Sequence, residues 1–181
     1  MIAVLLAEGF EEIEALTPVD LLRRAGLTVQ TVSIGTELTV RGSHGIEVTA
    51  DGLISQLNQE ELTAIVLPGG MPGTKHLEAS AAVQKLIDHA VAQNLVIGAI
   101  CAAPSILGHK GLLRGKQAIC FPGFEEALDG AVIPVGATVV ADGCIVTAKG
   151  MGVATEFGLV LVEKLASREK AESLHRSIQC P

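Results

Sequence analysis

One cysteine stands where an apolar run gives way to small residues. Residues 95–100 read Leu-Val-Ile-Gly-Ala-Ile, and Cys101 follows them directly, ahead of two alanines and Pro104. This order predicts a buried strand that turns sharply into a helix, with the proline near the first helical turn. Open α/β sheets bind ligands at the carboxyl ends of their strands, and a sharp strand-to-helix turn exposes a nucleophile there. Cys101 is therefore the candidate nucleophile.

A thiol needs help to act as a nucleophile at neutral pH. An ordinary cysteine with a pKa near 8.5 is only about 3% thiolate at pH 7. Lowering the pKa to about 6 makes the thiolate dominant and requires roughly 3.4 kcal/mol of differential stabilisation. A helix N-terminus supplies about 0.3–2 kcal/mol, so a second group must stabilise the Cys101 sulfur.

Glu14 is the candidate for that second group. The run Glu11-Glu12-Ile13-Glu14 follows the first apolar run and opens a helical pattern, which places it at the same edge of the sheet. An ionised carboxylate would raise the pKa of the thiol, whereas a carboxyl kept protonated by burial would donate a hydrogen bond to the thiolate. We expect the two groups to titrate jointly, with the proton on Glu14 and the charge on Cys101. Glu11 and Glu12 are expected to be solvated acids of the first helical turn.

A glycine pair ends another buried run. Leu67-Pro68-Gly69-Gly70 follows the apolar residues 64–67, and glycines allow the backbone to approach a reacting atom closely. The N–H groups of Gly70 and Ala102 are expected to form an oxyanion pocket beside Cys101.

The elements that must position these residues follow from apolar periodicity. Short β-branched runs alternate with helical patterns, which predicts a doubly wound, mostly parallel α/β sheet with helices on both faces. The predicted strands are residues 2–6, 27–33, 64–67 and 95–100, and the predicted helices are residues 11–25, 81–92, 103–110, 152–165 and 169–177. Pro18 predicts either a kink in the first helix or a restart at that point.

Two hairpins are predicted in addition to this plan. Residues 38–40 and 46–49 flank a segment that begins and ends with glycine. Residues 137–140 and 145–148 flank Asp142-Gly143, a dipeptide typical of two-residue hairpin turns.

Composition limits the classes of function. The 181 residues predict a single domain spanning residues 1–181, and the core must be aliphatic because the chain has four Phe and neither Trp nor Tyr. A formal net charge of −7 and the shortage of aromatic side chains make nucleic acid an unlikely partner, since such binding depends on clustered basic and stacking groups.

The cysteines and the N-terminus predict the compartment. Cys101, Cys120, Cys144 and Cys180 are too few and too widely spaced for a disulfide framework, and no pair has the spacing of a metal site. The N-terminal apolar run lacks a basic lead-in, and no run reaches the roughly 18 apolar residues of a membrane span. We expect a cytoplasmic protein with free thiols, no membrane association and no bound metal.

Together these segments resemble the ThiJ/PfpI superfamily, in the branch of the Parkinson's-associated deglycase/chaperone protein and bacterial YajL. The resemblance rests on the segments already quoted around Glu14, Gly70 and Cys101, and on residues 18–26 and 155–158, in order along nearly the whole chain. It implies a flavodoxin-like fold, a homodimer, and the roles given above for Cys101, Glu14, Gly70 and Ala102.

The resemblance also implies a choice of activities. One is cofactor-free glyoxalase or deglycase chemistry on a small aldehyde or a glycated protein, in defence against carbonyl and oxidative stress. The alternative is redox sensing or chaperone action through oxidation of Cys101. Arg24 and His44 match positions of possible anion contacts, and Phe121 stands where the branch often has a histidine.

Overall fold

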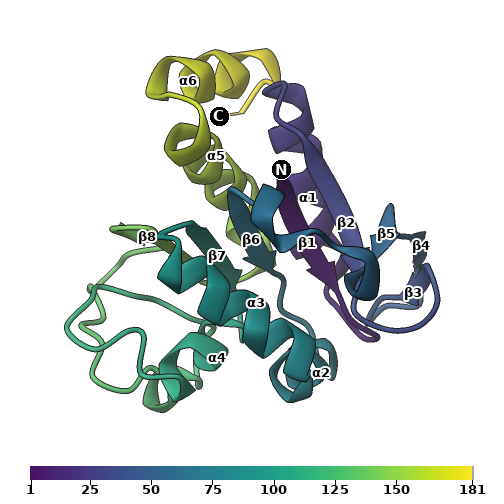
Figure 1. Ribbon diagram of the computed structural model, residues 1–181. Coiled ribbons are helices and arrows are strands. Elements are labelled where there is room, and N and C mark those ends of the chain that lie inside the picture. The colour runs from purple at the N-terminus through teal and green to yellow at the C-terminus, as the bar shows by residue number, and fades with distance from the viewer. Residues whose placement is uncertain (181) are drawn as a thin grey trace.

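The computed structural model describes residues 1–180, which are built around one seven-stranded sheet (Figure 1). The strand order is β5-β2-β1-β6-β7-β9-β8, and every neighbouring pair is parallel except β8 with β9. The strands are β1 (Ile2–Leu6), β2 (Val29–Ser33), β5 (Gly52–Leu53), β6 (Ala64–Leu67), β7 (Val96–Ile100), β8 (Val139–Asp142) and β9 (Ile145–Ala148). The doubly wound, flavodoxin-like α/β fold is therefore confirmed.

Helices cover both faces of this sheet (Figure 1). One face is covered by α1 (Glu12–Arg24) and α5 (Ala154–Leu165), and α6 (Arg168–Ser177) packs on α5. On the other face lie α2 (Gly73–Ala79), α3 (Ala81–Ala92) and α4 (Pro104–His109). All five residues of β1 are buried, as expected for a central strand with helices on both sides.

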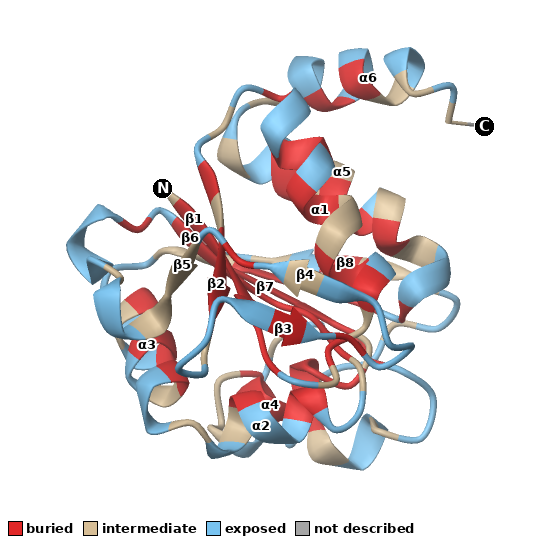
Figure 2. Ribbon diagram, turned by 90° about the vertical axis from the view of Figure 1, so that its right-hand side faces the viewer, coloured by how far each residue is buried: buried red, intermediate tan, exposed pale blue. Residues whose placement is uncertain are grey.

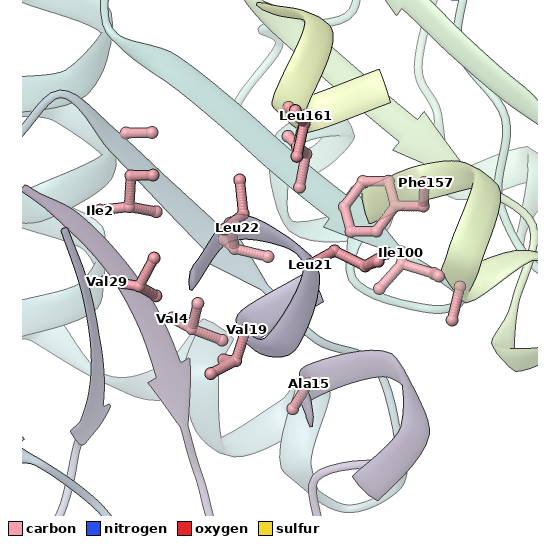
Figure 3. Packing of buried hydrophobic residues seen from close by; sticks show 14 of the residues in the cluster. Ile2, Val4, Ala15, Val19, Leu21, Leu22, Val29, Ile100, Phe157 and Leu161 are labelled. Carbon is pink, nitrogen blue, oxygen red and sulfur yellow. The ribbon is translucent and has the colours of Figure 1, made fainter. Parts of the chain in front are cut away.

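The side chains of β1 contribute to two separate aliphatic clusters, because successive side chains of a strand point to opposite sides of the sheet. Ile2 and Val4 lie in the cluster that contains Leu22 of α1 and Phe157 of α5, which Figure 3 shows packed together. Leu5 belongs to the opposite cluster. Figure 2 shows buried residues concentrated along the strands and on the helix sides that face them.

The helix α1 runs without interruption through Pro18. The buried residues of α1 recur with the period of a helix, so they lie on one side of it. Leu21 and Leu22 belong to this buried apolar side. The sequence left open a kink or a restart at Pro18, and the structure shows one continuous helix. The missing side chain of Gly158 lets α5 approach Pro18 closely, since a Cβ there would lie 3.3 Å from the proline Cα.

Both predicted hairpins are present, with one shift of register. The strands β3 (Thr39–Arg41) and β4 (Glu47–Thr49) pair antiparallel in a sheet of their own. In the second hairpin Asp142 pairs with Ile145, so the turn residues are Gly143 and Cys144 rather than Asp142 and Gly143. Within this turn Gly143 has a φ of 61°, a left-handed conformation that glycine adopts without steric strain.

The sequence missed two short elements and misplaced a helix start. The two-residue strand β5 and the seven-residue helix α2 are too short to produce a clear periodic pattern. The helix α5 begins at Ala154 and not at residue 152, because Met151–Val153 form a 3-10 turn ahead of it. Within residues 1–180, no helix combines the length and the apolar character needed to cross a bilayer.

Candidate active site

Cys101 occupies a sharp turn between β7 and α4. Its φ is 64°, a left-handed conformation that is uncommon for a residue with a side chain. The turn is held by two backbone hydrogen bonds: the Cys101 N–H donates to the Ala148 carbonyl at 2.9 Å, and the Phe121 N–H donates to the Cys101 carbonyl at 2.8 Å. Pro104 stands at the first turn of α4. The predicted strand–cysteine–helix turn is thus present, and it leaves the side chain half-buried.

Glu14 reaches the same point from the first turn of α1. Its side chain is buried, with 1% relative exposure, and its Oε2 accepts a hydrogen bond from the Gly69 N–H at 3.0 Å. The Met151 N–H is a second backbone donor to the carboxyl group, and the Cys101 thiol is its side-chain partner. The first turn of α1 is fixed by Glu11, whose Oε2 accepts from the Glu14 N–H at 2.7 Å.

The two groups share one ionisation near neutral pH. Burial raises the pKa of Glu14 to about 7, although hydrogen bonds from the Cys101 thiol and the Gly69 N–H oppose the shift. Burial, together with the Glu14 carboxylate, raises the pKa of Cys101 to about 12. The pair therefore carries one negative charge and one shared proton over the intervening pH range.

The joint titration expected from the sequence agrees with this geometry. Burial raises the pKa of both groups, and each faces the other directly. A thiolate at neutral pH requires that the shared proton lie on Glu14 and not on the sulfur, and this position of the proton stays a prediction.

Backbone N–H groups donate hydrogen bonds both to the Cys101 sulfur and to the Glu14 carboxyl. The N–H groups of Gly70 and Ala102 hydrogen-bond the Cys101 sulfur and lower the pKa of the thiol. Those of Gly69 and Met151 act in the same way on Glu14. Because each atom has two fixed donors, the negative charge is stabilised wherever the proton lies. The structure thus brings Gly70 and Ala102 together beside Cys101, and the oxyanion pocket that the sequence assigns to their N–H groups stays a prediction.

The two glycines of this loop cannot carry side chains. A Cβ on Gly69 would lie 2.6 Å from the Cys101 Cβ and 3.0 Å from the Ile100 carbonyl oxygen. Gly70 has a φ of 89°, and a Cβ there would lie 2.6 Å from the Gly9 carbonyl oxygen. Glycine at both positions is what allows the loop to bring its N–H groups up to the acid–thiol pair.

Glu12 is not the solvated acid that the sequence predicts. Its exposure is 3%, and it accepts hydrogen bonds from the backbone N–H and the Nδ1 of His44, both at 2.8 Å. Burial alone would raise its pKa, but these hydrogen bonds lower the pKa of Glu12 to about 2. These hydrogen bonds to the Glu12 carboxylate therefore connect the β3–β4 hairpin to the first turn of α1. The anion that His44 contacts is this internal carboxylate.

Arg24 does not lie at the reactive site of its own chain. It is ten residues beyond Glu14 on α1, which at 1.5 Å per residue puts the two about 15 Å apart along the helix. Its Nε pairs with Asp20 Oδ2 at 2.6 Å on an exposed surface. The expected anion contact of Arg24 near Cys101 is therefore wrong within one chain, and the expected homodimer stays a prediction.

Apart from Phe121, the sequence did not indicate the part of the site that comes from the segments after Cys120 and Ala148. Phe121, Pro122 and residues 149–153 line a pocket of about 250 Å³. Gly150 joins it to the acid–thiol pair, because a Cβ on Gly150 would lie 3.2 Å from the Phe121 ring and 3.8 Å from Glu14 Oε1. Gly150 follows the carboxyl end of β9, so the rule that located Cys101 could also have located this segment.

The buried Glu12 carboxylate leads to a prediction about stability. We expect Glu12→Gln to lower the free energy of unfolding at pH 7 by about 2 kcal/mol, because hydrogen bonds to a charged group are lost. The folded-state pKa of Glu12 is lowered, so its contribution is present above pH about 4.5 and is lost as the pH falls towards 2. Urea unfolding at pH 7 and pH 3 measures the difference, with the exposed Glu47→Gln on the same hairpin as control. An equal loss at both pH values would contradict this account.

Comparison with known proteins identifies the family and agrees with the fold. Residues 1–164 match the model of the DJ-1/PfpI family, and the chain belongs to that family. It is 38% identical to protein DJ-1 homolog B of Arabidopsis thaliana over 92% of this chain, but spans only 38% of that longer protein. It is 31% identical to the glutathione-independent glyoxalase DJR-1.2 of Caenorhabditis elegans, over 92% of this chain and 89% of that one.

Solved structures of relatives superpose over almost the whole chain. Oxidized DJ-1 of Toxoplasma gondii has a TM-score of 0.90 and 36% identity, over 98% of this chain and 97% of that one. A DJ-1 superfamily protein of Salmonella typhimurium has a TM-score of 0.93 and 35% identity, over 99% and 98% of the two chains.

Proposed function

We propose that the protein is a glyoxalase-type enzyme that converts α-oxoaldehydes into α-hydroxy acids through Cys101, without a cofactor. The observation that carries this proposal is the acid–thiol pair, in which one shared proton lies between Glu14 and a sulfur that has two backbone donors. The glyoxalase activity in the name of the Caenorhabditis elegans relative supports the same chemistry.

The proposed reaction begins with transfer of the shared proton from sulfur to Glu14. The thiolate attacks the aldehyde carbon, a C–S bond forms, and the carbonyl oxygen takes the proton from Glu14 to give a hemithioacetal. The Glu14 carboxylate then removes the hydrogen on that carbon as a proton, and the hydroxyl proton moves to the neighbouring carbonyl oxygen, which gives an enediol. Glu14 returns its proton to the neighbouring carbon as the first oxygen becomes the thioester carbonyl. This converts the hemithioacetal into a thioester, and water cleaves its C–S bond to release the hydroxy acid and the thiol.

The backbone donors have a role in each charged step. The N–H groups of Gly70 and Ala102 stabilise the thiolate before attack. After attack, they can donate to the oxygen on the substrate carbon that is bonded to the sulfur. The reaction is redox-neutral overall, because the aldehyde carbon is oxidised as the ketone carbon is reduced. In an early adduct on a protein amine or thiol, the Cys101 thiolate would instead displace that group from the carbinol carbon. The C–N or C–S bond to the protein breaks, the leaving group takes the proton from Glu14, and the same hemithioacetal forms. This is the deglycase form of the activity in carbonyl stress.

Lactate formation from methylglyoxal tests the proposal. We expect the wild type to produce lactate, and Cys101→Ser to reduce the rate at least 100-fold, because a hydroxyl is a much weaker nucleophile. Cys144→Ser is the matched control, since Cys144 is also partly exposed but lies in the β8–β9 turn, at the opposite end of β9 from Ala148. Turnover by Cys101→Ser at the wild-type rate, or no lactate from the wild type, would overturn the proposal.

A redox sensor is the second candidate function. It is favoured by the contrast between half-buried Cys101, whose sulfur has two backbone donors, and buried Cys120, which is 2% exposed. The Toxoplasma gondii relative was solved in an oxidized form. Mild peroxide followed by peptide mass mapping would then convert Cys101 to sulfinate selectively, with negligible turnover of aldehydes.

A further inference from the structure

A pocket beside the acid–thiol pair is walled by apolar groups that are not buried in the core. Phe121 is 47% exposed and Met151 is 54% exposed, whereas Phe10 and Phe157 are fully buried. Both exposed side chains line the pocket of about 250 Å³ described above, together with the half-buried Val153. A large aromatic side chain held at the surface next to a reactive group is typical of a binding wall.

This pocket is fixed directly to the reacting groups. The Phe121 N–H donates to the Cys101 carbonyl at 2.8 Å, and the Met151 N–H donates to the Glu14 carboxyl. Gly150 separates the pocket from the pair, because a Cβ on it would lie 3.2 Å from the Phe121 ring and 3.8 Å from Glu14 Oε1. The substituent of a substrate held at the sulfur can therefore extend across Gly150 to the Phe121 ring. The pocket has a volume of about 250 Å³ and is open to solvent, so one aromatic or branched alkyl group can lie against its walls.

Charge also favours an uncharged substituent. The acid–thiol pair carries a negative charge, and the carboxyl of Glu11 lies one helical turn from Glu14. The only charged side chain that lines the pocket in the described residues is Lys149, which is exposed to water and so is screened. Within the described residues of one chain, a carboxylate on the substrate would meet the negative pair without a buried cation to balance it.

We propose that Phe121, Met151 and Val153 form a subsite for the substituent of the α-oxoaldehyde, which selects uncharged aryl or branched alkyl groups over carboxylates. The identity of the substrate as an aldehyde rests on the proposed function. The selection itself is a property of the wall beside Cys101. Each methylene buried in such a pocket raises affinity about fourfold, so a phenyl group gains tenfold or more over hydrogen.

Alkylation of Cys101 tests the subsite without any turnover. We would measure second-order rates for iodoacetamide, N-phenyl iodoacetamide and iodoacetate by peptide mass mapping of Cys101, with glutathione as the reference thiol. The wild type is expected to prefer the phenyl reagent about tenfold more than glutathione does, and to disfavour iodoacetate. Phe121→Ser is expected to lose most of the phenyl preference, and Phe121→Leu to keep it.

Further variants separate the possible outcomes. Val135→Ser replaces a fully exposed apolar residue outside the pocket and is expected to leave the preference unchanged. Met151→Ser removes the other wall and is expected to weaken the preference, which keeps the test valid should Phe121→Ser fail to fold. A phenyl preference that is equal in the wild type, Phe121→Ser and Met151→Ser, or a preference for iodoacetate, would overturn the subsite.

Turnover then distinguishes the subsite from the reaction. The ratio of kcat/KM for phenylglyoxal to kcat/KM for methylglyoxal is expected to be about tenfold lower in Phe121→Ser than in the wild type. Selective alkylation without any hydroxy acid product would support the subsite and refute the glyoxalase proposal. Hydroxy acid production without selective alkylation would do the reverse.

Discussion

Replacing Glu14 by glutamine is expected to lower lactate formation from methylglyoxal at pH 7.5 by about 10²–10⁴-fold, the range of a lost general acid–base group. Glutamine keeps the shape of the side chain, but it can neither take the proton from Cys101 nor carry a proton between the two substrate carbons. The rate of lactate formation at saturating methylglyoxal measures the effect. Glu126→Gln, an exposed acid outside the site, should retain the wild-type rate.

The same substitution separates catalysis from folding. Burial raises the folded-state pKa of Glu14 from 4.5 to about 7, so its favourable contribution to folding is present below pH 4.5 and is lost as the pH rises through 7. A shift of that size corresponds to about 3 kcal/mol at pH 8, because the buried carboxylate must be ionised there. Glu14→Gln should therefore be at least as stable as the wild type at pH 8. A variant that loses activity only by unfolding would contradict the assigned role.

Gly69→Ala is expected to disable the site by crowding it. The added methyl group would meet the Cys101 Cβ and the Ile100 carbonyl oxygen, and neither atom can move without displacing the end of β7. Overpacking of this kind costs about 1–3 kcal/mol of stability. Displacement of the Glu14 carboxyl from the sulfur should also reduce the rate of lactate formation at least tenfold.

The matched control for Gly69→Ala is Gly52→Ala. A Cβ on Gly52 would meet nothing within 4 Å, and its φ lies outside the left-handed region, so the same chemical change is made where space exists. Urea unfolding and lactate formation should leave Gly52→Ala close to the wild type. Full activity in Gly69→Ala would show that the close approach of this loop to Cys101 is unnecessary.

The sequence could predict the residues that one topological rule brings together. Glu14, Gly70 and Cys101 each follow a buried apolar run, and parallel strands bring the ends of such runs to one edge of the sheet. The strands at the centre of the sheet were also predictable, because a continuous apolar run of five residues is typical of a strand that is buried on both faces.

What the sequence could not predict depends on partners distant along the chain. Glu12 resembles Glu11 locally, and only the hairpin around His44 makes it a buried, hydrogen-bonded carboxylate. The raised pKa values of Glu14 and Cys101 depend on how deeply each group is buried, which spacing along the sequence does not reveal. Arg24 lies away from Cys101 of its own chain because of the length of α1, so its anion contact, which was taken from family resemblance, depends on the homodimer and stays a prediction.

The pH dependence of Cys101 alkylation by iodoacetamide tests the shared ionisation most directly. If the acid–thiol pair loses its first proton as a unit, the rate in the wild type should rise with a midpoint near pH 7 and level off by about pH 9. In Glu14→Gln the midpoint near 7 should vanish, and the rate should rise about tenfold per pH unit throughout this range, as for a buried thiol alone. A wild-type profile without an inflection near pH 7, or the same midpoint in both proteins, would contradict the account.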